Sequence, residues 1–280
     1  MLTESEAPWW EHPAAAWEPL MLYLHHLTGI TIPPQKADMV RSRLRRQLVR
    51  LRPSNCAHFE ALLRQNEQER QTFINLLTTN ETSFFRTERI WKYFSRIFLP
   101  EFTQHPAERT LRAWSAAAST GEEALSIAIC CQEHRQSHPG FRYQILATDV
   151  NTEVLEQARS GIFSARSAQR LREAHPDWLS RYLRPGPEDR VQADAELLLH
   201  TRFLQHNLMH PAQPMGEHDI VFLRNALIYF RPTEQARILH HVSTIMAPGA
   251  ILVLGESESI ATLDVPFQFV EPQVYSRRPA

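Results

Sequence analysis

Cysteine is scarce in this chain, and the few cysteines present form no recognisable pattern. The chain has an odd number of cysteines, Cys56, Cys130 and Cys131, and no two of them have C-x-x-C spacing. Such a set argues against a disulfide framework or a zinc site, and it favours a reducing compartment. The 14 histidines are scattered along the chain, and we expect no metal site.

Long apolar runs and an excess of one charge are also missing. No run approaches the roughly 18–20 residues that a membrane-spanning helix needs, and the acidic residues 1–10 lack the order of a signal peptide. Lys and Arg total 30 against 31 Asp and Glu, which does not indicate a nucleic-acid or membrane partner. We expect a cytoplasmic monomer of one or two domains that neither inserts into a membrane nor binds nucleic acid.

Glycine-rich phosphate-binding motifs are a further absence. The apolar run 111–116 is followed by Ala-Ala-Ser-Thr-Gly-Glu-Glu at 117–123, which has neither G-x-G-x-x-G nor the Lys-Ser/Thr of a P-loop. Glu122 and Glu123 suit the positive end of the helix that they begin, but they would repel a pyrophosphate. The loop therefore disfavours a dinucleotide and favours a ligand with positive charge.

Strands alternate with helices from residue 111 onward. We expect strands at 111–116, 143–148, 203–205, 220–223 and 251–254, and helices at 124–131, 152–160 and 233–246. This alternation predicts a parallel, doubly wound sheet, to which the tail 267–277 adds an antiparallel edge. Residues 18–100 have helical spacing, for example Leu20 and Leu24 on one face.

Asp149 ends the second expected strand, at the distance from the glycine loop where an acid binds ribose hydroxyls. The alternative is that Asp149, with Asn151, caps the next helix. A ligand that carries both a ribose and a positive charge suggests S-adenosylmethionine.

Two polar segments precede the sheet. Residues 78–86, Thr-Thr-Asn-Glu-Thr-Ser-Phe-Phe-Arg, are read as a polar lip on a pocket, in which Arg86 supplies a charge for an anion. The alternative is a helix end that only joins two domains. Between Gly29 and Pro53 there are seven basic residues and one acid, Asp38, which is either a partner surface or a solvated helix face.

Several motifs, in family order, closely resemble the CheR-type chemoreceptor protein-glutamate O-methyltransferases. They are Thr78-Thr-Asn-Glu-Thr-Ser-Phe-Phe-Arg86, Trp114-Ser-Ala-Ala-Ala-Ser-Thr-Gly-Glu-Glu123, Ala147-Thr-Asp149, Ala158-Arg-Ser-Gly161, Arg224-Asn225 with Ile228-Tyr-Phe230, and Gly255-Glu-Ser-Glu-Ser259. The resemblance covers about residues 18–278. It implies an α/β fold: a Rossmann-like class I methyltransferase sheet with a small all-α N-terminal domain and a small inserted antiparallel β-subdomain.

The resemblance also implies domain bounds. We expect a disordered tail at 1–17, a helical domain at 18–90, and an S-adenosylmethionine-binding domain at 91–280 with the β-subdomain near 178–202.

The resemblance further assigns site residues. The positions that match cofactor contacts are Asn80, Thr82, Arg86, Glu123, Asp149, Asn207, Leu208, Arg224 and Asn225. Arg86 and Tyr229 match positions that orient the reacting carboxylate, and S-adenosylhomocysteine would be the product.

The implied reaction is methyl transfer from S-adenosylmethionine to glutamate side chains of chemoreceptors, which are the methyl-accepting chemotaxis proteins, for sensory adaptation. The implied partner is their cytoplasmic helical bundle, and we expect Arg41, Arg45 and Arg52 to bind its acidic surface. Some members tether to a C-terminal receptor peptide beside a glycine-rich loop. Residues 181–190 keep only Gly186 there, so we expect no tether.

The chain departs from the family pattern in two places. Ala124-Leu125 replace the Pro-Tyr of many members, which should alter helix packing rather than chemistry, and Glu256 stands where many have histidine. Two other functions stay open: a methyltransferase for small molecules or RNA, and a catalytically silent adaptor that binds receptors or a response regulator. Loss of Arg86, Asp149 or Tyr229 would indicate the adaptor, and all three are present.

Overall fold

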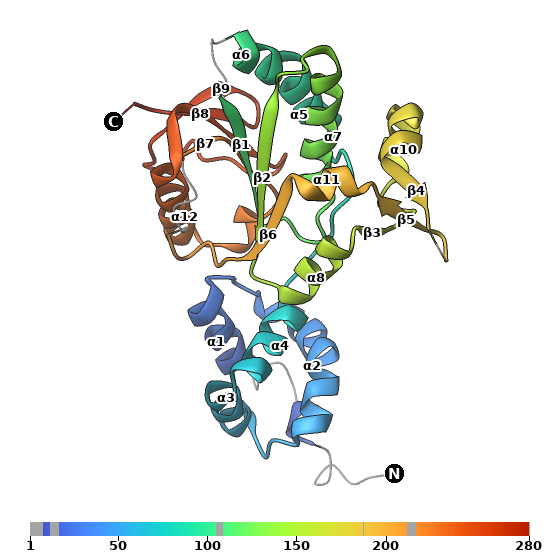
Figure 1. The fold of residues 1–280 in the computed structure, drawn as a ribbon. Coiled ribbons are helices and arrows are strands. Elements are labelled where there is room, and N and C mark those ends of the chain that lie inside the picture. The colour runs from blue at the N-terminus through green and yellow to red at the C-terminus, as the bar shows by residue number, and fades with distance from the viewer. Residues whose placement is uncertain (1–7, 12–16, 105–108, 187, 212–216, 280) are drawn as a thin grey trace. The chain divides into compact units, whose positions relative to one another are not determined.

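The computed structural model describes residues 8–11, 17–104, 109–186, 188–211 and 217–279, which form two compact units (Figure 1). The helical unit comprises Met1–Thr79 with Tyr229–Glu234, and the sheet unit comprises Asn80–Ile228 with Gln235–Ala280. Most of the expected tail 1–17 lies outside the described residues. The boundary expected between residues 90 and 91 falls inside helix α5 (Glu88–Tyr93).

The helical unit is built from short amphipathic helices. They are η1 (Trp9–Glu11), α1 (Glu18–Thr28), η3 (Pro34–Lys36), α2 (Ala37–Leu51), α3 (Cys56–Gln65) and α4 (Glu67–Leu77). In α2, Val40, Leu44 and Leu48 recur at every fourth position and are fully buried, so this stripe forms the inner face of the helix. The predicted helical spacing of this region is confirmed.

Side-chain caps and one glutamate fix how the helices of this unit begin and pack. Asn55 and Asn66 accept N-terminal backbone N–H groups of α3 and α4. Glu69 in α4 accepts hydrogen bonds from Arg50 (2.7 and 2.6 Å) and Gln47 (3.0 Å) of α2. Arg50 is therefore a structural residue of this unit, and its charge is engaged.

The sheet unit alternates strands and helices. Its helices are α5, the π-helical turn η4 (Phe94–Phe98), α6 (Leu99–Gln104), α7 (Glu122–Ser137), α8 (Thr152–Ser160), α9 (Gln169–Ala174), α10 (Pro176–Tyr182), α11 (Ala195–Leu199), η5 (Leu227–Tyr229) and α12 (Pro232–Thr244), the last two extending into the helical unit. Its strands are β1 (Thr110–Ala116), β2 (Arg142–Asp149), β3 (Ile162–Ser164), β4 (Leu183–Pro185), β5 (Arg190–Ala193), β6 (Thr201–Gln205), β7 (His218–Leu223), β8 (Met246–Leu254), β9 (Phe267–Glu271) and β10 (Val274–Arg277).

Seven strands form the main sheet in the order β6-β2-β1-β7-β8-β10-β9. The first five are parallel, and β10 pairs antiparallel with both β8 and β9. The predicted doubly wound sheet and its antiparallel edge are confirmed. The chain runs outward from β1 to β2 and β6 and then returns to β7, so the direction of winding reverses between β1 and β7. Ligands of such sheets bind at this switch point, beyond the carboxyl ends of the strands.

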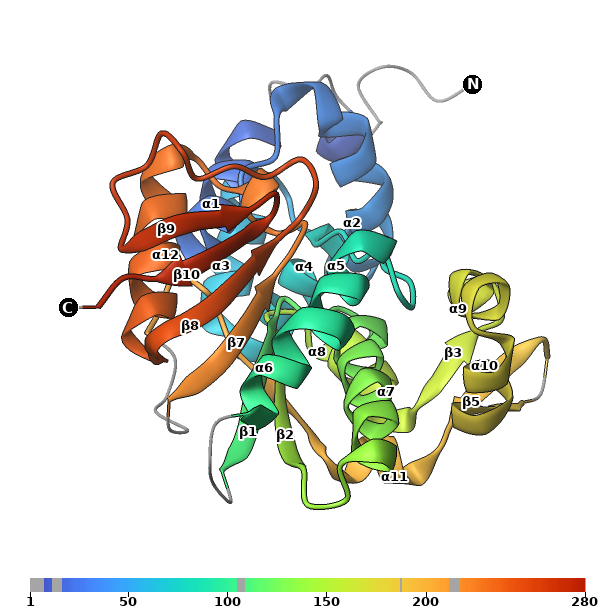
Figure 2. The same cartoon turned by 90° about the horizontal axis from the view of Figure 1, so that it is seen from above.

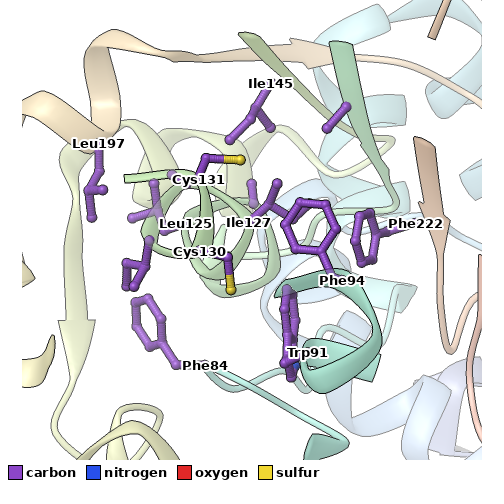
Figure 3. Packing of buried hydrophobic residues seen from close by; sticks show 14 of the residues in the cluster. Phe84, Trp91, Phe94, Leu125, Ile127, Cys130, Cys131, Ile145, Leu197 and Phe222 are labelled. Carbon is purple, nitrogen blue, oxygen red and sulfur yellow. The ribbon is translucent and has the colours of Figure 1, made fainter. Parts of the chain in front are cut away.

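The main core lies between the sheet and α7. This helix is buried on nearly all sides over residues 122–131 and packs with α5 and η4 (Figure 2). Figure 3 shows Trp91, Phe94 and Phe222 gathered beside Ile127 and Cys130. Trp91 stacks on Phe222 with 5.7 Å between ring centroids. A core of this density holds the strand ends, and hence the site, in place.

A second sheet, β3-β5-β4, is fully antiparallel and has three strands. It begins at Ile162, earlier than the range 178–202 expected from the sequence, because the three residues after Gly161 pair with β5. Residues 195–199 and 201–205 are α11 and β6.

Candidate functional site

The loop between β1 and α7 has a strained backbone. Ala117, Ser119 and Gly121 have positive φ angles of 65°, 51° and 98°. A Cβ atom on Gly121 would lie 2.9 Å from the Cβ of Ala158, so glycine is required by both conformation and space. Strain of this kind costs free energy, and it clusters at ligand sites.

Asp149 fixes this loop from the end of β2. Its Oδ2 accepts the N–H of Ser119 and its Oδ1 accepts the N–H of Asn151, both at 2.9 Å. Burial raises the pKa of this carboxyl, and the backbone N–H groups oppose the rise. The helix cap is Asn151, whose side chain accepts from Glu153 and Val154. Of the two residues in the alternative reading, Asn151 is the cap and Asp149 is not.

Glu123 lies in the first turn of α7 and is almost fully buried. Its Oε1 accepts the hydroxyl of Ser115 at 2.7 Å, and its Oε2 is 3.1 Å from Nη1 of Arg224. Burial raises the pKa of Glu123, and the Arg224 charge opposes that rise. Glu122, also buried, has its pKa raised by burial and accepts from Thr120 at 2.6 Å.

Arg224 follows β7 and connects three parts of the site. Besides Glu123, it donates through Nη2 to the carbonyl oxygen of Arg86 at 2.8 Å, and its guanidinium lies 5.9 Å from the ring centroid of Trp91. The same carbonyl accepts from Nε1 of Trp91 at 2.9 Å. Among the described residues Nε of Arg224 is buried with no hydrogen-bond partner, which leaves one donor for a ligand.

Glu258 joins the loops that follow β7 and β8. Its carboxylate accepts the backbone N–H groups of Gly255 (2.6 Å), Asn225 (2.8 Å) and Leu227 (2.7 Å). Asn225 has a φ of 57°. A side chain on Gly255 would collide with both Glu258 and Asn225 at 2.7–2.9 Å. Glu256, by contrast, is exposed.

Residues 78–87 form no helix, and only part of the segment is a polar surface. Phe84 and Phe85 are buried, and their N–H groups donate to Ser167 and to the hydroxyl of Ser126. The carbonyl of Asn80 accepts from Ser119 at 2.9 Å, which ties the segment to the β1–α7 loop. Arg86 is partly exposed and donates to the carbonyl of Glu81 at 3.1 Å.

The structure thus brings Asn80, Arg86, Glu123, Asp149 and Arg224 together at the carboxyl ends of β1, β2 and β7. Asn225 joins them through Glu258. Thr82 is partly exposed in the lip. Asn207 and Leu208 follow β6, where His206 donates its N–H to the carbonyl of Asp149 at 2.9 Å.

Tyr229 belongs to the helical unit, where it is partly exposed and its carbonyl accepts from Thr31 at 2.8 Å. In the same unit Arg45 and Arg52 are exposed, and Arg41 pairs with Asp38 at 2.6 Å. One of the three arginines expected to bind a partner is thus partly neutralised.

Three residues of this arrangement were not predicted: Ser115, Trp91 and Glu258. Ser115 and Trp91 bond to Glu123 and Arg86, which are eight and five residues away. Glu258 bonds to Asn225 and Leu227, 33 and 31 residues away, which spacing cannot reveal. Glu258 does stand inside the Gly255–Ser259 motif, which was a usable signal.

Comparison with known proteins gives a consistent result. The model described as "CheR methyltransferase, SAM binding domain" matches residues 80–276, and "CheR methyltransferase, all-alpha domain" matches residues 15–78. The chain therefore belongs to the CheR family of methyltransferases, and it carries an S-adenosylmethionine-binding methyltransferase domain of class I fold.

Curated relatives agree. The chain is 36% identical to a chemotaxis protein methyltransferase of Escherichia coli strain K12 over 261 residues, which is 90% of this chain and 87% of that protein. It is 34% identical to chemotaxis protein methyltransferase 2 of Pseudomonas aeruginosa over 257 residues, covering 90% and 89%. A solved magnesium protoporphyrin IX methyltransferase from Synechocystis PCC 6803 has a TM-score of 0.37 at 12% identity, covering 69% of this chain and 82% of that one, which is too low to support a comparison.

Across the described residues, no helix is both long enough and apolar enough to cross a membrane. Nor do those residues include a group of three His, Cys, Asp or Glu side chains that could hold a metal ion.

Proposed function

We propose that this methyltransferase transfers the methyl group of S-adenosylmethionine to glutamate side chains of chemoreceptors and forms glutamyl methyl esters. The observation that carries the proposal is the cluster of Asp149, Glu123 and Arg224 at the carboxyl ends of β2, β1 and β7. The family membership supports it, as do the names of relatives, which are chemotaxis protein methyltransferases.

The residues of this cluster fit the cofactor chemically. Asp149 suits ribose hydroxyls, and the buried Nε of Arg224 offers a donor to the anionic end of the amino acid part. We assign the cofactor contacts to nine residues: Asn80, Thr82, Arg86, Glu123, Asp149, Asn207, Leu208, Arg224 and Asn225. When bound, S-adenosylmethionine supplies a methyl group already activated on a sulfonium.

The side chains then have little chemistry to perform. A glutamate carboxylate is already anionic at neutral pH, so no general base is needed. We assign Arg86 to orienting this carboxylate, because this residue is partly exposed and, among the described residues, its guanidinium donates only to the carbonyl of Glu81. Tyr229 keeps the same proposed role on the strength of its family motif alone. Placement at roughly 3–3.5 Å and exclusion of water would supply most of the acceleration.

For the receptor, we propose the α2 surface around Arg41, Arg45 and Arg52. Arg45 and Arg52 are exposed, and neither makes a salt bridge within the described part of the chain. Such a surface suits the acidic, amide-rich helical bundle of a receptor's cytoplasmic part. Each methylation removes one charge from that bundle and shifts its signalling equilibrium.

We further propose that no C-terminal receptor peptide is required. The turn between β4 and β5 is tight, since Gly186 donates to the carbonyl of Arg190 at 2.8 Å. Pro185 lies in β4, an edge strand, and cannot donate to an added strand. Pro187 lies outside the described residues.

We propose that these roles are divided between a helical receptor-binding part and a catalytic part with a small β-subdomain. The compact units, divided at Thr79 and Asn80, support this arrangement.

The test is incubation with labelled S-adenosylmethionine and membranes that contain candidate receptors. Label should enter the receptor and be released as methanol by mild base, as a glutamyl ester requires. Arg86→Ala should cut the rate strongly, and Arg86→Lys should not restore it fully, because lysine lacks the planar fork. A base-stable product would refute the ester, and binding to receptors without any transfer would favour the adaptor.

A further inference from the structure

A cavity of about 830 Å³ lies in the sheet unit and shares Trp91 with the surroundings of Arg224. It is bounded by α5, the π-helical turn η4, the C-terminal half of α7, and α9 and α10. On α7 its lining begins at Cys130, roughly 12 Å along the helix from Glu122 at 1.5 Å per residue. Its volume is within the range of small-molecule sites, and none of the residues assigned to cofactor or receptor lines it.

One wall of the cavity is aromatic. His175 and Trp178 stack with 4.0 Å between centroids and an interplanar angle of 9°, and Phe85 lies 5.8 Å from each. Trp91 contacts Phe85 edge-on at 5.2 Å. Burial lowers the pKa of His175, which favours the neutral imidazole. Together these rings offer flat faces on which a planar ring can stack.

The charged side chains that line the cavity differ in whether they already have a partner. Its three glutamates already accept hydrogen bonds: Glu88 from Lys92 at 2.7 Å, Glu133 from Tyr182 at 2.7 Å, and Glu173 from Gln169 at 2.6 Å. Arg96 and Arg170 also line the cavity, and neither makes a hydrogen bond or salt bridge with a described residue. Glu88 is paired with Lys92, and Glu133 is paired with Arg181. Arg96 and Arg170 then face one remaining carboxylate, Glu173, so the balance of charge on the lining is positive.

Two further features indicate a ligand. Arg96 stands in η4, and π-helical turns are rare and frequently occur at functional sites. Nε2 of His134, another lining residue, is buried without a hydrogen-bond partner among the described residues. An orphaned buried nitrogen calls for an explanation, and a ligand would supply its partner.

We propose that this cavity binds a planar aromatic anion, a flat ring system that carries a phosphate or carboxylate group. The ring stacks against Trp178 and His175, and the anionic group pairs with Arg170 and Arg96. Since Trp91 and Phe85 line the cavity and Trp91 also bonds the carbonyl of Arg86, the occupant contacts the side chains that position the lip.

The experiment is a calorimetric titration of the full chain in the presence of saturating S-adenosylhomocysteine. Because this product occupies the cofactor site, a nucleotide probe cannot give a signal by binding there. The probes are guanosine 5′-monophosphate and 2-naphthoate, which represent a nucleotide and an aromatic acid, with guanosine and inorganic phosphate as half-probes. At least one anion should bind one to one, and each half-probe should bind more weakly. The probe that binds shows whether the ligand is a nucleotide or an aromatic acid.

Variants make the result specific. Arg170→Ala should weaken binding at least roughly tenfold through loss of a charged hydrogen bond, and Trp178→Ala roughly tenfold through loss of stacking. Arg172→Ala is the matched control, because this exposed arginine is on the same helix but does not line the cavity, and it should bind normally. Absence of binding by both anions, or equal binding by Arg170→Ala and the parent, would overturn the proposal.

Discussion

Removing the charge of Arg224 should destabilise the unliganded protein severely, and the cost should depend on pH. Arg224→Met leaves Glu123 buried with only the Ser115 hydroxyl as a partner. Breaking one half of a buried ion pair typically costs about 3–5 kcal/mol. We expect a loss of this size in the free energy of unfolding at pH 7.5, measured by urea denaturation followed by tryptophan fluorescence.

The pH dependence follows from the raised pKa of Glu123. The folded state holds this proton more tightly than the unfolded chain, whose glutamate pKa is about 4.3. Stability therefore falls as pH rises from the unfolded pKa to the folded one. Without Arg224 the folded pKa rises further and the window widens, so the deficit of the variant should shrink toward pH 5.

Two companion variants test this reasoning. Arg224→Met with Glu123→Gln removes both charges and should recover much of the loss. Arg89→Met breaks an exposed pair with Glu271 at 3.6 Å and should cost at most about 1 kcal/mol. If Arg224→Met cost no more than this control at pH 7.5, or lost as much at pH 5, the buried-pair account would be refuted.

Three other outcomes are expected. Asp149→Ala should weaken binding of S-adenosylhomocysteine by ~1–3 kcal/mol in calorimetry, with Asp149→Asn losing less; unchanged affinity would exclude the ribose contact. Gly121→Ala should lower stability by about 1–3 kcal/mol, because of its φ of 98° and the Ala158 contact, whereas Gly140→Ala, with open space around it, should not. Arg45→Glu should reduce receptor methylation in a salt-sensitive way while deletion of the receptor's last residues leaves it unchanged; tight binding of an isolated C-terminal receptor peptide would contradict this.

The sequence predicted the sheet well because its information is local. Apolar runs, their alternation with helical segments, and Gly161 after α8 all act over a few residues. Asp149 could likewise be placed at a strand end. Its two backbone partners could not, since Ser119 approaches it only through a loop with positive φ angles.

Long-range side-chain contacts limited the prediction of the site. Phe84 and Phe85 were read as part of a polar lip. Both are buried, because moving an aromatic ring from water into the protein core stabilises the fold. In the 255–259 motif, Glu256 was noted as a departure from the family pattern, whereas the buried carboxylate is Glu258. The substitution Ala124-Leu125 was expected to affect packing, and both residues are fully buried beside the sheet.

One consequence of the position of Glu258 is that the loop of Asn225 is ordered before any ligand binds. One carboxylate holds three backbone N–H groups from the two loops that follow β7 and β8. In many proteins, a loop that presents such N–H groups becomes ordered only when a phosphate or carboxylate binds. Here the anion is part of the chain, so the loop of Asn225 loses its conformational entropy when the protein folds. A ligand that meets this loop finds it already in shape, and its affinity is not reduced by the cost of arranging it.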